Sequence, residues 1–247
     1  MHNYYSIPPN LYDDQFWWKK DDIEFWKSEV SSSNNVLELG SGTGRIAQSF
    51  GLMNINYIGL DISLEYINYS KKKFLEFENL NFIHADMIDF SLNKKFDVIF
   101  IAFNSFLHLL NEQDASQCLS SIKKHMHKNS KLIIDIFVPH PQFLFRNKDS
   151  MLHILDFYNN SLKEEQFINE ILEYNSDNEI ANVHWLYGNN KKKKISEFKF
   201  QMKMYYPDTM NKILIDSGYH ITSFWGSYEK LYFSKDSNLQ IYCCQLK

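Results

Sequence analysis

An apolar stretch that leads into three closely spaced glycines constrains this chain more than any other feature. Residues Val36 to Leu39 are typical of a buried strand, and Gly40, Gly42 and Gly44 follow at alternate positions. Glycine is needed where a tight turn requires positive φ or where the backbone approaches a ligand closely. We expect a helix to begin directly after this turn, with its unpaired N–H groups facing a polar or anionic group.

A second strand-like segment indicates that the ligand is a nucleotide. Tyr57 to Asp61 is an apolar run that ends in a carboxylate. In nucleotide-binding strand–turn–helix units, a carboxylate about 20 residues after the glycines binds the ribose hydroxyls. The dinucleotide fingerprint places its third glycine one residue later than Gly44. This spacing, and the lack of a recognisable hydride-handling site, disfavour a nicotinamide oxidoreductase.

The glycine segment has an acidic residue inside its strand, Glu38, and the run from Glu38 to Gly44 resembles motif I of the class I S-adenosylmethionine (SAM)-dependent methyltransferases. The resemblance implies SAM as cofactor and S-adenosylhomocysteine as product. It implies that Glu38 and the glycines hold the methionine end, that Asp61 holds the ribose, and that Asp86 with Met87 holds the adenine. The implied cofactor-binding residues are Tyr12, Trp18, Glu38, Leu39, Gly40, Ser41, Gly42, Thr43, Gly44, Arg45, Asp61, Ile62, Asp86, Met87, Ile88 and Phe103.

Two members of this set have a second interpretation. Arg45 either pairs with the carboxylate of the cofactor or is a surface arginine in the first helical turn. Trp18, beside Trp17, either belongs to a lid over the nucleotide turn or packs as an ordinary aromatic side chain.

The segment after the fourth expected strand bears on the reaction class. Ala102 to Ser105 lacks the Asp/Asn-Pro-Pro-aromatic tetrapeptide of DNA adenine-N6 and protein glutamine methyltransferases. The run Phe103 to Leu109 instead resembles the loop of small-molecule methyltransferases, which include amino-sugar N-methyltransferases, relatives of glycine N-methyltransferase and phosphonate O-methyltransferases. Tyr12 matches the same group, in which such a tyrosine lies near the methionine end of the cofactor. The resemblance covers residues 5 to 140.

His108 and Asn104 are the candidate catalytic residues in this loop. A hydroxyl acceptor needs a general base with a pKa near neutrality, which suits histidine. His108 is therefore our candidate base, and the alternative is that it starts the next helix or bonds a backbone carbonyl. Asn104 either orients the acceptor or caps the turn.

The alternation of strands and helices predicts an α/β fold. We expect a Rossmann-like, doubly wound, seven-stranded sheet that is mostly parallel with an antiparallel last strand. We expect residues 1–35 to form an N-terminal lid, with Pro8 and Pro9 breaking any early helix. Residues 36–141 and 206–247 should form the SAM-binding domain. Residues 142–205, where strand periodicity replaces the earlier pattern, should form an inserted antiparallel β cap that lines part of the substrate pocket.

Composition limits the partners. A net charge of −4 over 247 residues argues against broad nucleic-acid or anionic-membrane binding. The four lysines Lys191 to Lys194 either hold RNA or a phosphorylated substrate, or form a solvated hairpin loop. The three cysteines have neither a disulfide framework nor metal-ligand spacing, and we expect no metal. No apolar run reaches membrane-spanning length and no signal peptide is evident, which indicates a cytoplasmic protein.

The sequence thus predicts a cytoplasmic SAM-dependent methyltransferase that methylates O or N of a small polar metabolite, such as a sugar, an amino sugar or a small phosphorus-containing acid. We expect a small-molecule acceptor rather than nucleic acid or membrane, and a homodimer through the β cap is one assembly that this organisation allows. Two alternatives stay open: a tRNA or rRNA methyltransferase, and a non-catalytic SAM-binding partner subunit.

Overall fold

The protein is described by a computed structural model that covers residues 7–147, 150–191 and 194–247. Its residues fall into two compact units. The sheet unit comprises Asp21–Val138 and Tyr205–Lys247, and the cap unit comprises the described residues up to Lys20 together with Pro139–Met204. The segment 1–35, expected as a single lid, is therefore divided between the two units at Lys20.

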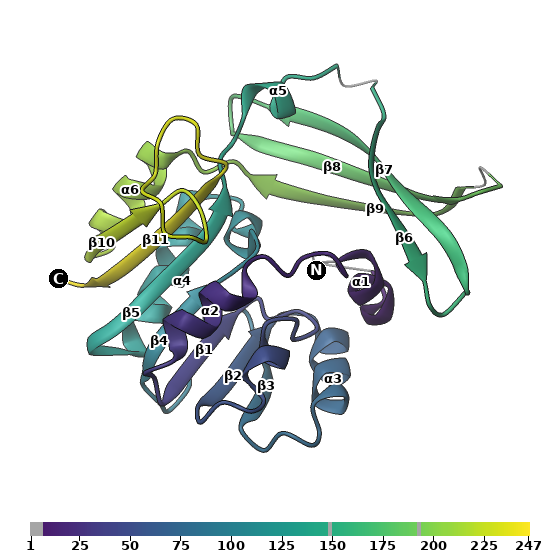
Figure 1. The fold of residues 1–247 in the computed structure, drawn as a ribbon. Coiled ribbons are helices and arrows are strands. Elements are labelled where there is room, and N and C mark those ends of the chain that lie inside the picture. The colour runs from purple at the N-terminus through teal and green to yellow at the C-terminus, as the bar shows by residue number, and fades with distance from the viewer. Residues whose placement is uncertain (1–6, 148–149, 192–193) are drawn as a thin grey trace. The chain divides into compact units, whose positions relative to one another are not determined.

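The sheet unit is built on seven strands in the order β10-β11-β5-β4-β1-β2-β3 (Figure 1). The strands β1 to β5 are mutually parallel, whereas β11 runs antiparallel to β5 and β10 runs antiparallel to β11. The seven-stranded, doubly wound fold is confirmed. Their bounds are β1 Asn35–Leu39, β2 Asn56–Asp61, β3 Leu80–His84, β4 Phe96–Ile101, β5 Met126–Phe137, β10 Tyr219–Trp225 and β11 Leu239–Leu246.

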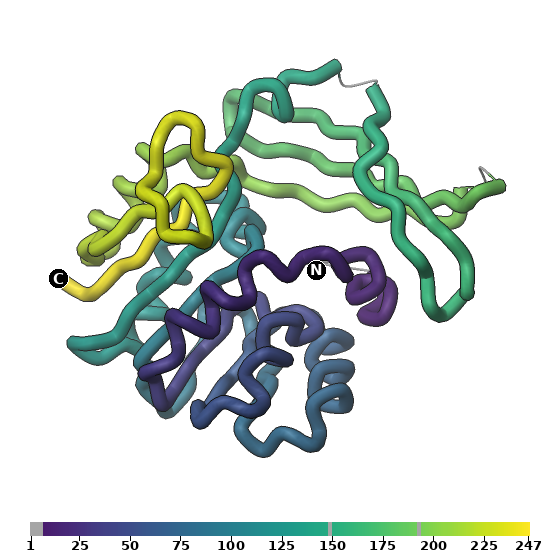
Figure 2. The backbone as a smooth tube through the Cα atoms, viewed as in Figure 1, coloured from purple at the N-terminus to yellow at the C-terminus, as the bar shows by residue number. Residues whose placement is uncertain are grey.

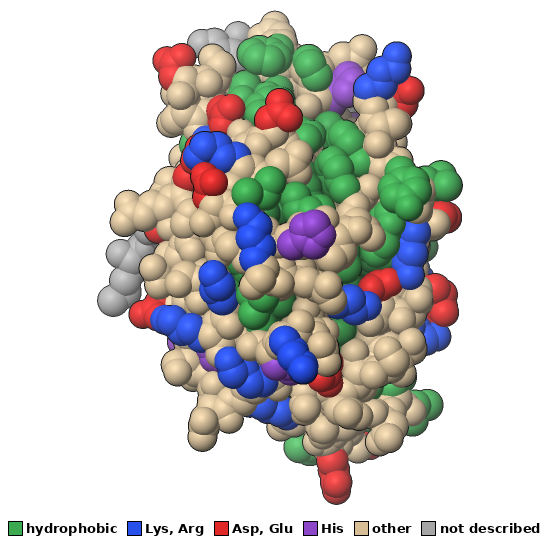
Figure 3. Space-filling view, turned by 90° about the vertical axis from the view of Figure 1, so that its left-hand side faces the viewer, with side chains coloured by type: hydrophobic (Ala, Val, Ile, Leu, Met, Phe, Trp, Pro, Cys, Tyr) green, Lys and Arg blue, Asp and Glu red, His purple; other side chains and the backbone are tan. Residues whose placement is uncertain are grey.

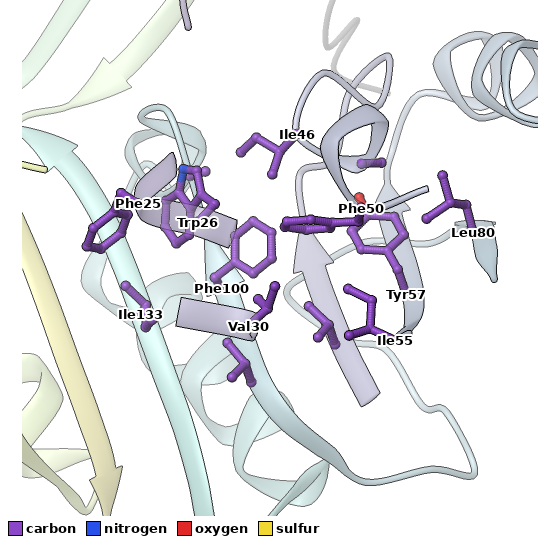
Figure 4. Close-up of a cluster of buried hydrophobic side chains, with 14 of the residues drawn as sticks. Phe25, Trp26, Val30, Ile46, Phe50, Ile55, Tyr57, Leu80, Phe100 and Ile133 are labelled. Atoms are coloured by element: carbon purple, nitrogen blue, oxygen red, sulfur yellow. The ribbon is translucent and has the colours of Figure 1, made fainter. Parts of the chain in front are cut away.

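Helices cover both faces of this sheet, with α2 in front of it and α4 behind it in Figure 1. The helical bounds are α2 Ile23–Val30, η1 Ala47–Phe50, α3 Leu64–Lys73, η2 Ser105–His108, α4 Glu112–Lys124 and α6 Pro207–Asp216, where η denotes a 3₁₀ helix. Side chains from α2, η1 and α3 pack with the strands in one apolar cluster. At its centre the ring of Trp26 stacks on Phe100 at 4.5 Å between centroids, and Phe50 meets both Phe100 and Tyr57 (Figure 4). This cluster fixes the strands whose ends carry the candidate site.

The cap unit is a four-stranded antiparallel sheet in the order β6-β7-β8-β9, which the tube in Figure 2 follows as three successive reversals of the chain. The bounds are α1 Pro9–Gln15, α5 Pro141–Leu144, β6 Leu152–Asn159, β7 Glu164–Asn175, β8 Ile180–Asn189 and β9 Lys194–Lys203. Alternate residues of β7 are buried: Gln166, Ile168, Glu170 and Leu172. Helix α1 contacts β6, and Leu11 and Tyr12 pack against the apolar cluster of this face.

Local residue types account for several helix ends. The side chain of Ser63 caps α3 by accepting from the backbone N–H of Tyr66, and that of Asn111 caps α4 by accepting from Asp114. Pro207 begins α6, and Gly218 follows its end with a φ of +84°. β7 and β8 pair as an antiparallel hairpin, and the connecting residues 176–179 are all polar. These features depend on residues within a few positions of one another.

Other local expectations were wrong. Pro8 and Pro9 do not prevent an early helix, because Pro9 is the first residue of α1, where its missing N–H leaves no bond unmade. Asn129 is of a residue type that often ends helices, but it does not end α4. This helix ends at Lys124 with His125 as its cap, and Asn129 lies inside β5. Strand β6 was not predicted.

Of the four lysines, Lys192 and Lys193 lie outside the described residues, so the two interpretations of that loop stay untested. Among the described residues, no helix combines the length and the apolar character needed to cross a membrane.

Candidate active site

The glycine turn after β1 has three residues in the left-handed region. The φ angles are +72° at Gly40, +55° at Gly42 and +75° at Gly44, which residues with a side chain rarely adopt. The N–H of Gly40 donates to the carbonyl oxygen of Leu60 on the neighbouring strand at 2.8 Å. A Cβ added to Gly40 would lie 2.7 Å from Cβ of Ser105. The backbone here is therefore enclosed by the loop that follows β4, and only glycine fits.

The expected α-helix directly after this turn is absent. Residues Gly42 to Ile46 form a succession of turns, and the helix that follows, η1, is a 3₁₀ helix of only four residues. Gly44 contributes to this outcome because glycine is a poor helix former. The turn does not present the unpaired N–H groups of a helix start, because its N–H groups donate within the protein: Gly40 and Ser41 to the carbonyl oxygen of Leu60, Gly42 to Asp61 and Gly44 to Ser41.

Asp61, the last residue of β2, is directly tied to the glycine turn. Its carboxylate accepts from the N–H of Gly42 and from the N–H of Ser63, both at 2.8 Å. Burial raises the pKa of Asp61, and these two backbone hydrogen bonds act against that rise. A carboxylate offers about four acceptor positions, so two remain beyond the backbone bonds. Asp61 can thus orient the turn and still accept from a pair of hydroxyls.

Glu38, in β1, is a buried acid with a phenol as its partner. The hydroxyl of Tyr57 donates to its Oε2 at 2.5 Å. Gly59 lies directly opposite Glu38 in the sheet, and a Cβ there would meet the Tyr57 hydroxyl and Ser41 at 2.8 Å. Burial raises the pKa of Glu38 to about 8, although the Tyr57 hydrogen bond and the charge of Arg45 lower it. A cation brought to this carboxyl would stabilise its ionised form.

Arg45 is neither a lone surface arginine nor part of an α-helix. Its two terminal nitrogens donate to the two carboxylate oxygens of Asp22, each at 2.7 Å. Asp22 is fully buried and also accepts from the indole N–H of Trp26 at 3.2 Å. The guanidinium lies 5.3 Å from the ring centre of Phe103. The ion pair therefore fastens the start of α2 to the glycine turn.

The loop after β4 contains two consecutive non-glycine residues with positive φ, Phe103 at +49° and Asn104 at +68°. Such strain persists only where neighbouring groups enforce it. Here the side-chain oxygen of Asn104 accepts from the N–H of Phe137 at 2.8 Å, and the Asp135 carboxylate accepts from the N–H of Phe103 at 3.2 Å and from the Tyr228 hydroxyl at 2.8 Å. The side chain of Asn104 thus ties the loop to the end of β5 and makes no capping hydrogen bond to η2. Its role toward an acceptor stays a prediction.

The other sequence-predicted residues of the sheet unit also follow strand ends. His108 is the half-buried last residue of η2 and lies seven residues after the end of β4. Asp86 lies two residues beyond β3 and accepts from the N–H of Ile88 at 2.9 Å. Ile62, directly after Asp61, is an apolar side chain that is 41% exposed. Leu39, the last residue of β1, and Thr43, in the glycine turn, are buried, and Met87 and Ile88 are half-buried.

Tyr12 and Trp18 belong to the cap unit. Tyr12 lies on α1 with its ring 4.7 Å from that of Phe16, and it packs against the apolar cluster of the cap sheet. Trp18 follows α1 and is 45% exposed. For Tyr12 the structure thus supplies a packing role, whereas Trp18 presents a large exposed aromatic surface.

A family model with the description "methyltransferase domain" matches residues 30–199. The chain belongs to this family. Membership confirms the expectation of a methyltransferase domain. The matched residues include the glycine turn, Asp61, Asp86 and the loop after β4.

Relatives of this methyltransferase differ in their acceptors. Malonyl-[acyl-carrier protein] O-methyltransferase 2 from Ilyobacter polytropus is 43% identical over 70 residues, which cover 27% of this chain and 26% of that protein. The match thus spans about a quarter of that relative's length. The tRNA1(Val) (adenine(37)-N6)-methyltransferase of a Flavobacteriaceae bacterium is 27% identical over 173 residues, covering 62% of this chain and 74% of the relative.

Solved structures share the fold over nearly the whole methyltransferase. The CcbJ methyltransferase from Streptomyces caelestis superimposes with a TM-score of 0.80 at 16% identity, covering 92% of this chain and 94% of its own. CalS10, an amino pentose methyltransferase from Micromonospora echinaspora with SAM bound, has a TM-score of 0.71 at 13% identity, covering 100% and 99%. At these identities the similarity establishes the fold.

The residues of the methyltransferase fit SAM. The glycine turn has no Cβ at Gly40, Gly42 or Gly44, Asp61 keeps acceptor positions for ribose hydroxyls, and Glu38 is a buried carboxyl that a cation would ionise. The methionine end of SAM carries an ammonium and a sulfonium, which are cations of this kind.

Sequence reasoning missed the residues that hold these groups in place, namely Asp22, Tyr57, Gly59, Asp135 and Tyr228. One signal was available: a glycine inside a strand indicates close approach of another group, and Gly59 stands opposite Glu38. The others had no local signal, because each partner is 19 or more residues away along the chain.

Proposed function

We propose that this protein transfers a methyl group from SAM to an oxygen or nitrogen atom of a small polar metabolite. The observation that carries the proposal is the connection between consecutive strand ends in the sheet unit. Gly42 after β1 is hydrogen-bonded to Asp61 at the end of β2, and Gly40 is in close contact with Ser105 after β4. In open α/β sheets, ligands bind beyond the carboxyl ends of the strands, where these residues lie.

In this proposal the cofactor-binding residues keep the roles expected from the sequence. Glu38, Leu39, Ser41, Thr43 and the three glycines hold the methionine end, Asp61 with Ile62 holds the ribose, and Asp86, Met87 and Ile88 hold the adenine. Phe103 contributes an aromatic contact. Arg45 acts through Asp22, which occupies its guanidinium, so we assign it the positioning of the turn rather than a bond to the cofactor.

The bound cofactor supplies a methyl group on a sulfonium, which is already a good leaving group. The chain must then hold the acceptor atom in line with the methyl group and exclude water from it. For a hydroxyl acceptor, His108 accepts the proton as the oxygen attacks. An amine that enters unprotonated needs no such base.

Charge favours a small acceptor over nucleic acid. The chain has a net charge of −4, and on the face in Figure 3 Lys and Arg side chains are spread between uncharged and acidic ones. Neighbours in fold include an amino pentose methyltransferase. The second candidate is a tRNA methyltransferase, which the match to the tRNA1(Val) enzyme favours. The proposal keeps the cytoplasm as the compartment and a homodimer through the β cap as an assembly to be tested.

Transfer of label from methyl-labelled SAM into separate acceptor pools tests the proposal. The pools are amino sugars with nucleotide sugars, amino acids, phosphorylated and phosphonate metabolites, and total tRNA, each tested with wild type and His108→Ala. We expect label in one small-molecule pool. Loss of that label in His108→Ala assigns the base and a hydroxyl acceptor, whereas retention assigns an amine acceptor. Label in tRNA alone contradicts the proposal, and SAM binding without label in any pool favours the non-catalytic alternative.

A further inference from the structure

The buried face of the cap sheet carries a charged cluster that the methyltransferase site does not use. Glu170 on β7 lies directly opposite Trp185 on β8, and the indole N–H of Trp185 donates to its Oε2 at 2.8 Å. Arg146, from the segment after α5, donates to the other oxygen, Oε1, at 2.6 Å. The side chains of Arg146 and Glu170 are only 9% and 7% exposed. Replacing such a buried pair by apolar residues is often neutral or stabilising, so stability alone does not explain its presence.

Two buried donors on this face lack a partner within the described part of the chain. One is Nε of Arg146, and the other is the side-chain nitrogen of Gln15, whose oxygen accepts from the hydroxyl of Tyr187 at 2.7 Å. Tyr187 is two residues from Trp185 on the same strand, so its side chain emerges on the same face. A buried donor without an acceptor costs about 1–3 kcal/mol. Each is thus a donor for which the described residues supply no acceptor.

Aromatic rings adjoin these donors. Phe200 meets Trp185 edge-to-face with 5.0 Å between ring centres, and Phe198 stacks against Phe200 at 5.3 Å. Phe16 lies 6.3 Å from Trp185. Trp185, Phe200 and Phe16 are half-buried rather than fully enclosed, so part of their apolar surface is left for another group to cover.

We infer that Arg146, Glu170 and Trp185, with Gln15, form a binding subsite for the hydroxyl-bearing ring of a carbohydrate. The charge of the cluster selects this class, because Glu170 already neutralises Arg146 and leaves no net positive charge for a phosphate or carboxylate. A sugar ring presents an apolar C–H face to aromatic rings and hydroxyls at its edge. Those hydroxyls accept from Arg146 and Gln15 and donate to Glu170. The inference rests on the proposed function insofar as this carbohydrate is the methyl acceptor.

The probes separate the hydroxyls from the rest of the ligand. D-Glucosamine, N-acetyl-D-glucosamine and methyl β-D-galactoside carry a hydroxylated ring, whereas cyclohexylamine has a six-membered ring and an amine without hydroxyls. Saturation-transfer NMR detects ligands that bind weakly, in the millimolar range. We expect signals from at least one sugar and a weaker signal from cyclohexylamine. No signal from any sugar, or an equal response to cyclohexylamine, overturns the inference.

Variants separate a binding role from a structural one. The double variant Arg146→Met/Glu170→Leu replaces the ion pair by apolar side chains, so we expect an unchanged or higher melting temperature and about 10- to 100-fold weaker sugar binding. Glu170→Gln keeps the shape of the side chain and removes its charge, so it should weaken sugar binding by a smaller factor than the double variant does. The control is Glu197→Gln on β9, which removes an exposed acid 42% accessible to solvent. Sugar binding that is equal in wild type and the double variant overturns the inference.

SAM titration of the same proteins keeps the two proposals distinguishable. SAM affinity should be the same in wild type and in the double variant, because neither Arg146 nor Glu170 is among the proposed cofactor-binding residues. Wild type that binds sugars and not SAM contradicts the proposed function and supports the subsite. The wild-type protein can instead bind SAM and methylate a different class of metabolite, and the double variant can do so equally well. That result contradicts the subsite and leaves the proposed function standing.

Discussion

The guanidinium of Arg45 and the carboxylate of Asp22 form two parallel hydrogen bonds of 2.7 Å. Asp22 is fully buried at the start of α2, and Arg45 belongs to the turn that begins at Gly40. Bidentate pairs of this kind fix orientation as well as distance. The pair consequently fixes the start of α2 against the glycine turn.

We expect Asp22→Ala to lower the free energy of unfolding by about 3 kcal/mol, because it leaves the Arg45 charge and the Trp26 indole without their buried acceptor. It should also weaken SAM binding through the displaced turn. Urea denaturation and calorimetric SAM titration measure the two effects. The matched control is Asp216→Ala, which removes an exposed i,i+4 partner of Lys212 and should change stability by less than about 1 kcal/mol. Equal losses in the two variants would contradict the role given to Asp22.

Gly40→Ala should destabilise the protein for two separable reasons. A left-handed conformation costs alanine about 1–2 kcal/mol, and the new Cβ would stand 2.7 Å from Cβ of Ser105. The double variant Gly40→Ala/Ser105→Gly removes the second cause only. We therefore expect partial recovery of stability and of SAM affinity relative to the single variant. Full recovery would show that backbone strain is unimportant at Gly40.

Glu38 should make stability depend on pH. Burial raises its pKa from the usual 4.5 to about 8 in the folded protein, so between these values the folded state binds the proton and the unfolded state does not. The free energy of unfolding should thus fall as the pH rises through this window. Glu38→Gln, which is neutral throughout, should give a flatter profile in chemical denaturation at a series of pH values. The exposed Glu76→Gln serves as control, and identical slopes for wild type and Glu38→Gln would rule out this source.

Substitutions at Asn104 should follow its structural role. Asn104→Asp keeps both the acceptor for the Phe137 N–H and the tolerance of positive φ, so its stability should be near that of wild type. Asn104→Gly keeps only the tolerance of positive φ. Asn104→Ala keeps neither property, which should lower the free energy of unfolding by about 2 kcal/mol in total. Thermal unfolding gives the ranking Asp, Gly, Ala. If the three variants are equally stable, the hydrogen bond at 2.8 Å does not hold this loop.

Features that depend on neighbouring residues were predictable from the sequence. The caps Ser63 and Asn111 bond backbone amides three residues ahead, and the apolar runs before Gly40 and Asp61 mark strands by their composition. The glycine spacing indicated the cofactor class before any contact was known. All of these signals lie within one turn or one strand.

The partners of the site residues were decided by tertiary structure. Nothing local shows that Tyr57 reaches Glu38, that Asp22 holds Arg45, or that Asp135 holds the N–H of Phe103. The helix expected after Gly44 gave way to turns and a short 3₁₀ segment, and α1 joined the cap rather than residues 21–35.

The sequence by itself therefore determined the strand–turn–strand unit and its methyltransferase family, because periodicity, capping and glycine conformation act over a few residues. Only the tertiary structure decided which acids are buried, which donors they receive and which loops are strained. Those properties arise when strands distant in the chain pack together and remove water from polar groups, so that each group must find its partner among residues that the local sequence does not specify.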